Sequence, residues 1–74
     1  MNQKDFEATL KDGQEVRLRW HETSVLATVE RVNKSSIAVR IKEPIAGYDA
    51  GSRVVVARVL SGRRSAGKCV RPVT

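Results

Sequence analysis

The chain has 74 residues, with 14 Lys and Arg against 8 Asp and Glu, and its formal net charge at pH 7 is +6. A chain this short has room for one domain, residues 1–74, because a single small core supplies only about 3–5 kcal/mol of stability. No apolar run approaches the roughly 18 residues of a membrane span, and the first residues do not resemble a secretory signal, so we expect no membrane partner.

The positive charge is concentrated in the last third of the sequence. Residues 1–52 hold eight basic and eight acidic side chains, whereas residues 53–74 hold six basic and none acidic. Such an excess attracts polyanions, although in some small domains it serves solubility alone. The single cysteine, Cys69, cannot form an intramolecular disulfide, so we expect a reducing, cytoplasmic compartment.

Alternating side chains predict strands in the first half of the chain. Residues 6–10 are expected to form a short strand, and in residues 16–20 apolar and basic side chains alternate. Within residues 24–33 the apolar side chains change parity. This change predicts a β-bulge near residues 30–31, which would bend the strand.

The second half continues the same pattern. A hairpin connection at residues 33–36 leads into a strand over residues 37–41, and Pro44 ends it because proline has no N–H for the ladder. Residues 45–52 are predicted to form a loop. Residues 53–60 are nearly all apolar and predict a further strand.

The sequence gives less information about the strand over residues 53–60 and about the end of the chain. The apolar run leaves the facing of this strand open, and if Val55, Ala57 and Val59 point inward, Arg58 lies on the outer surface. Residues 61–67 are predicted to form an exposed basic loop, and residues 69–73 a last short strand. About five antiparallel strands in so short a chain predict an all-β, small single-domain SH3-like barrel, with an OB-like barrel as the second choice.

Basic side chains on the outside of the sheet and in the loop form the candidate site. Arginine suits phosphate because its planar guanidinium donates two parallel hydrogen bonds. The alternative is that the sheet residues pair with Glu15, Glu30 and Glu43 and that the loop arginines contact only water. The predicted nucleic-acid-binding residues are Arg17, Arg19, Arg40, Lys42, Arg58, Arg63, Arg64 and Lys68.

Two aromatic side chains are candidates for stacking on a base. Trp20 has the parity of the inward aliphatic residues, which favours the core. Tyr48 lies in the long loop and is the better stacking candidate, although it could simply cap the barrel.

Enzyme chemistry has little support in the sequence. Residues 62–69 nearly spell a phosphate-binding P-loop, but Cys69 replaces the magnesium-binding Ser or Thr, and Pro72 prevents the helix that such a loop needs. One histidine, His21, and one cysteine cannot make a structural zinc site, and no base accompanies the thiol. We therefore predict a protein that is not an enzyme, with no catalytic residue, metal or cofactor.

The alternating runs at residues 13–18, 27–32 and 37–41 resemble the small SH3-like barrels, including the KOW-type modules that bind nucleic acid or ribosomal partners. The resemblance covers most of the chain as a pattern of strands, and folds of this kind host many functions.

These observations predict a non-catalytic binder of the phosphate backbone of DNA or RNA. If about five phosphates are neutralised, log affinity should fall with log salt at a slope near −4 to −5. The alternative is a protein-interaction module, for instance a small phage- or plasmid-type accessory subunit, that forms homo-oligomers or docks on an acidic protein partner.

Overall fold

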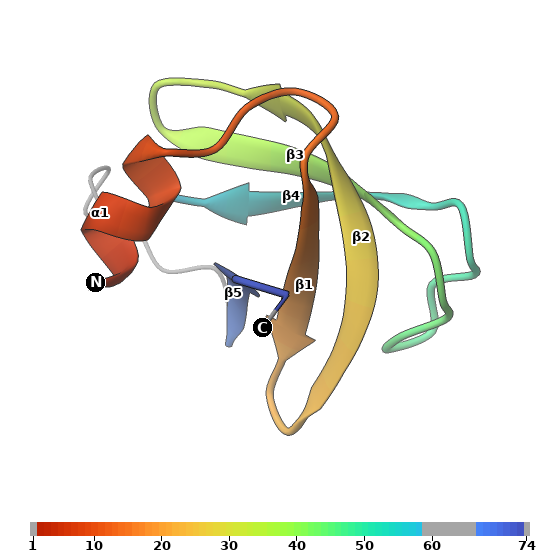
Figure 1. The fold of residues 1–74 in the computed structure, drawn as a ribbon. Coiled ribbons are helices and arrows are strands. Elements are labelled where there is room, and N and C mark those ends of the chain that lie inside the picture. Colours follow the sequence, from red (N-terminus) through yellow and green to blue (C-terminus); the bar gives the residue numbers. More distant parts are fainter. Residues whose placement is uncertain (1, 59–66, 74) are drawn as a thin grey trace.

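A curled antiparallel sheet dominates the computed structural model, which describes residues 2–58 and 67–73 (Figure 1). Within these residues one helix precedes five strands: α1 (Gln3–Ala8), β1 (Glu15–Trp20), β2 (Thr23–Val32), β3 (Ser36–Ile41), β4 (Arg53–Ala57) and β5 (Lys68–Arg71). The strand order is β4-β3-β2-β1-β5, and every pair is antiparallel. The prediction of a small all-β fold is confirmed.

The bend in the long strand β2 comes from a β-bulge at the predicted place. Val29 pairs with Val39 and Arg31 pairs with Ala38, so Glu30 is an extra residue on β2. An unpaired residue of this kind bends its strand and increases the local twist. The bulge therefore helps the sheet to curl around its aliphatic face.

The inner face of the curl buries the short aliphatic side chains that alternate along the strands. Val16 and Leu18 of β1 and Ile37 and Val39 of β3 are fully buried, as their parity predicts. Trp20, at the end of β1, is half-buried and packs against this core. The opposite parity of these strands faces outward, and that outer surface carries the candidate site.

The predicted facing of β4 is wrong. Val54 and Val56 are 4% and 0% exposed, whereas Val55 is 52% exposed. The register with β3 explains this result, because Ile37 pairs with Val56 and directly opposite residues share a face of the sheet. An unbroken apolar run gives no alternation from which that face could be predicted. Val59 lies outside the described residues.

The predicted strand over residues 6–10 is also wrong, because the chain forms α1 there. Asn2 caps the helix, its Oδ1 accepting a hydrogen bond from the Asp5 N–H at 2.8 Å. Phe6 is buried in the core. Gln3 Nε2 donates to the carbonyl of Val70 at 2.7 Å, which fixes the helix against β5.

Candidate anion-binding face

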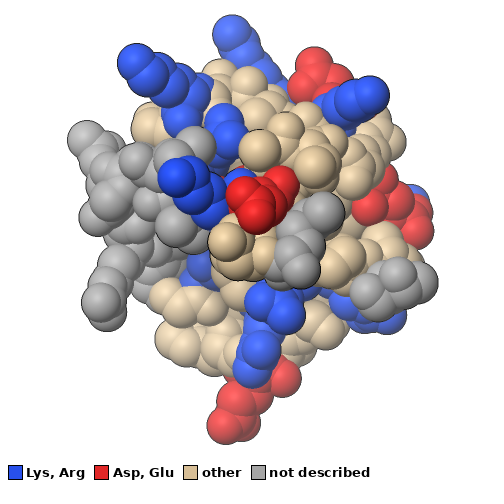
Figure 2. Space-filling view, turned by 60° about the vertical axis from the view of Figure 1, so that its left-hand side comes forward, with Lys and Arg blue, Asp and Glu red and all other residues tan. Residues whose placement is uncertain are grey.

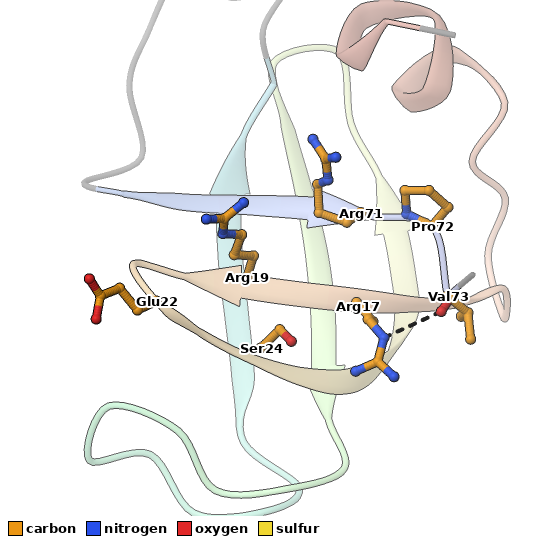
Figure 3. Close-up of a pocket in the computed structure, with 7 residues that line it drawn as sticks. All are labelled: Arg17, Arg19, Glu22, Ser24, Arg71, Pro72 and Val73. Carbon is orange, nitrogen blue, oxygen red and sulfur yellow. Dashed lines mark hydrogen bonds between the residues drawn. The ribbon is translucent and has the colours of Figure 1, made fainter.

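Three arginines gather around a hollow on the outer face of β1 and β5 (Figure 3). Arg17 and Arg19 come from β1, and Arg71 comes from β5. The hollow measures about 460 Å³, and its remaining lining residues are Glu22, Ser24, Pro72 and Val73. We name the three guanidinium groups and this hollow the arginine face.

The register of β1 with β5 brings these side chains together. Arg17 lies directly opposite Arg71, and Arg19 lies opposite Cys69. Since residues two apart on a strand share a face, Arg17 and Arg19 both point outward, while Leu18 between them is fully buried. The predicted outward placement of both β1 arginines is thus observed.

The guanidinium groups of the arginine face keep most of their hydrogen-bonding capacity. Arg17 Nε donates to the Val73 carbonyl at 3.3 Å, and Arg19 Nε donates to the His21 carbonyl at 3.1 Å. Within residues 2–58 and 67–73, none of the three groups forms an ion pair. Among the described residues, no acceptor is found for their terminal N–H groups, whose fork geometry suits phosphate oxygens.

Three basic side chains farther across the sheet form ion pairs with carboxylates. Arg40 lies 3.1 Å from Glu30, and Arg53 lies 3.8 Å from the same carboxylate. Lys42 forms an ion pair with Glu15. The alternative in which sheet cations pair with Glu15 and Glu30 thus describes Arg40 and Lys42, but not Arg17 and Arg19.

Arg58 does not join the outer surface of the sheet. It follows β4 and is half-buried, and its Nη1 donates to the carbonyl of Asn33 in the β2–β3 hairpin at 2.9 Å. The expectation that Arg58 lies outward with the other arginines came from the reversed facing of β4. Its observed contact instead ties the end of β4 to that hairpin.

Lys68 belongs to β5 and points away from the arginine face. It lies opposite Trp20, and its Nζ sits 4.9 Å from the centroid of the Trp20 ring. The same Nζ donates to the carbonyl of Val55 at 3.3 Å, so the side chain reaches from β5 to β4. Arg63 and Arg64, the other predicted loop contacts, lie outside the described residues.

Arg71 is the residue that the sequence prediction missed. It lies within the predicted last strand, but its neighbour in space is known only from the pairing of β5 with β1. No local pattern in the sequence indicates that Arg71 lies opposite Arg17.

Basic and acidic side chains are mixed on the surface of the described residues (Figure 2). Figure 2 shows several Lys and Arg side chains on one face, with acidic groups among them. Net charge alone therefore does not define a binding site. A better criterion is whether each basic side chain is already paired with a carboxylate. By that criterion the arginine face is a candidate site, because its three arginines line one hollow and none forms an ion pair with a described residue.

Other kinds of site have less support in the described residues. They contain no group of three or more His, Cys, Asp or Glu side chains that could hold a metal ion. Cys69 is a free, half-buried thiol. No helix within residues 2–58 and 67–73 has the length and apolar character needed to span a membrane.

Comparisons of this chain with protein-family models, with curated proteins and with solved structures find no match. The chemistry of the arginine face therefore rests on its own residues.

Proposed function

We propose that this protein is a non-catalytic nucleic-acid-binding module that contacts the phosphate backbone through the arginine face. The observation that supports this proposal is that three arginine side chains line one hollow and that none of them forms an ion pair with a described residue. Each guanidinium group can donate two parallel hydrogen bonds to the oxygens of one phosphate. Contacts to phosphate give affinity with weak sequence preference.

The predicted binding residues do not contribute equally to the proposed site. Arg17 and Arg19 remain central, and Arg71 joins them. Arg40 and Lys42 are secondary because a bound phosphate would have to compete with Glu30 and Glu15. Arg63 and Arg64 are proposed as a second pair of contacts on the segment between β4 and β5.

We further propose that the sheet closes as an SH3-like barrel. Two observations support this closure. Strand β5 pairs with β1 at one end of the sheet, and Lys68 on β5 donates to the Val55 carbonyl on β4, the strand at the other end. The two ends of the sheet therefore approach each other. The lone cysteine supports a reducing, cytoplasmic setting for the protein.

A charge-matched pair of variants tests the binding face. The double variant Arg17→Gln/Arg71→Gln removes two positive charges from the arginine face, and Lys42→Gln/Arg53→Gln removes two from the paired side of the sheet. Binding of a fluorescently labelled DNA or RNA duplex at low salt is measured by anisotropy. We expect the first variant to weaken binding about ten- to a hundredfold and the second to change it only a few-fold.

Equal losses in the two double variants would show that net charge acts without a site. Absence of duplex binding by the unchanged protein would overturn the nucleic-acid proposal itself. Thermal unfolding of each variant, followed by circular dichroism, confirms that the fold is intact before affinities are compared.

One observation favours a protein-interaction module as the second candidate. Val55 is 52% exposed on the outer face of β4, and among the described strands β4 pairs only with β3. An exposed aliphatic side chain on the end strand of a sheet can pack against a partner protein or a second copy. Light scattering coupled to size-exclusion chromatography would show stable oligomers if this candidate is correct.

A further inference from the structure

A second group of side chains lies at the end of β1, on the side opposite the arginine face. The rings of Trp20 and Tyr48 have centroids 5.5 Å apart and are tilted by 34°. Lys68 Nζ lies 4.9 Å from the centroid of the Trp20 ring. These three residues, which we name the aromatic group, include the one tryptophan and the one tyrosine of the chain.

Tyr48 is exposed, yet its backbone is held in place. Ile45 and Tyr48 exchange two backbone hydrogen bonds, of 3.0 and 2.8 Å, across a two-residue turn. Ile45 is 5% exposed and anchors this turn in the core, whereas Tyr48 remains 45% exposed. A ring that is fixed at its base and open to solvent can stack on a planar ligand with little loss of conformational entropy.

The aromatic group and the arginine face are neighbours along β1. Arg19 and Trp20 are consecutive residues on opposite faces, and their partners on β5 are Cys69 and Lys68. The following β1–β2 turn carries Glu22, which lines the hollow of the arginine face. A strand of nucleic acid that leaves this hollow past the turn therefore reaches the side of the sheet that carries Tyr48.

We propose that Tyr48 is a stacking platform for one unpaired base of the nucleic acid whose phosphates lie on the arginine face. Lys68 adds positive charge beside the platform, and Trp20 supports it from behind. With one open ring, the platform takes one base, as in a bulge, a hairpin loop or a strand end. An unpaired base is the favoured ligand because a paired base would first have to leave its stack. The inference rests on the proposed function.

The test compares a short labelled DNA duplex with the same duplex carrying one unpaired deoxyadenosine. We expect the unchanged protein to bind the bulged duplex about tenfold more tightly, in line with stacking of one base on an aromatic side chain. The emission of Trp20 should change when the bulged duplex binds and stay nearly constant with the paired duplex, because Trp20 contacts the platform ring.

Three variants separate stacking from other contacts. Tyr48→Ala should lose the preference for the bulged duplex and keep its affinity for the paired one, whereas Tyr48→Phe should keep the preference. Val55→Ala removes another exposed apolar side chain and should leave the preference unchanged.

Equal affinity of the unchanged protein for the two duplexes would overturn the platform and leave the proposed function standing. Failure to bind either duplex would overturn both. Loss of the preference in Tyr48→Phe as well as Tyr48→Ala would show that the hydroxyl acts, and it would contradict stacking.

Discussion

Arg17 on β1 and Arg71 on β5 lie directly opposite each other, so two guanidinium groups project from adjacent points on one face of the sheet. Like charges in this relation destabilise a sheet by a few tenths to about 1 kcal/mol. Glu15, the acidic residue two positions from Arg17 on β1, is already paired with Lys42. A bound anion beside these arginines would reduce this repulsion, which supports the proposed site.

Replacing one member of this arginine pair should raise stability and lower binding. Arg71→Glu puts a carboxylate opposite Arg17, so we expect the free energy of unfolding to rise by about 0.2–1 kcal/mol while duplex affinity falls. Urea denaturation and anisotropy measure the two effects. Lys42→Glu changes the net charge equally but faces Glu15, so its stability should fall. A loss of stability in both variants would contradict the repulsion between Arg17 and Arg71.

Gly67→Ala should destabilise the protein more than Gly47→Ala. Both glycines have positive φ, +83° and +86°, which costs about 1–2 kcal/mol for an alanine. A Cβ on Gly67 would also lie 2.6 Å from Cε1 of His21, whereas a Cβ on Gly47 meets no atom within 4 Å. Thermal denaturation of both variants measures the difference. In a His21→Ala background the excess cost at Gly67 should disappear, and its persistence would show another cause.

Ala46→Asn should stabilise the turn that carries Tyr48. Ala46 and Gly47, the two central residues of this turn, have φ of 51° and 86°. A two-residue turn with positive φ at both positions prefers Asn-Gly, because asparagine adopts the left-handed region more easily than alanine. We expect the free energy of unfolding to rise by about 0.5–1 kcal/mol in urea denaturation. An unchanged or lower midpoint would mean that this turn is not strained at Ala46.

The facing of β4 can be checked with one substitution at two adjacent positions. Val56→Thr buries a hydroxyl in the core, so the free energy of unfolding should fall by about 1–3 kcal/mol. Val55→Thr places the hydroxyl in solvent, so the free energy of unfolding should change by less than about 0.5 kcal/mol. Chemical denaturation of the two variants gives the comparison. The reverse order would support the facing predicted from the sequence.

The strands that alternate could be predicted, and those that do not alternate could not. The parity change in β2 predicted the bulge at Glu30, because a bulge shifts the side-chain period by one residue. In β4 three consecutive valines removed that signal, and its facing is set by pairing with Ile37 on β3. Helix α1 was missed because six residues show little periodicity, although Asn2 as a cap was a usable signal.

The candidate site could be predicted only by residue type. The sequence indicated that Arg17 and Arg19 point outward, but it left open which of the sheet cations pair with glutamates. Which cations are neutralised depends on neighbours across strands, as Lys42 with Glu15 shows. Arg71 joins the site through a β1–β5 pairing that spans most of the chain, and no local pattern reveals such a pairing.

The salt dependence of duplex binding tests the central claim most directly. If the three arginines of the arginine face and the two of residues 63–64 each neutralise one phosphate, log association constant against log salt should have a slope near −4 to −5. The variant Arg17→Gln/Arg71→Gln should reduce this slope by about 2, and Lys42→Gln/Arg53→Gln should leave it nearly unchanged. Identical slopes for the two variants, or a slope near zero for the unchanged protein, would contradict phosphate binding at the arginine face.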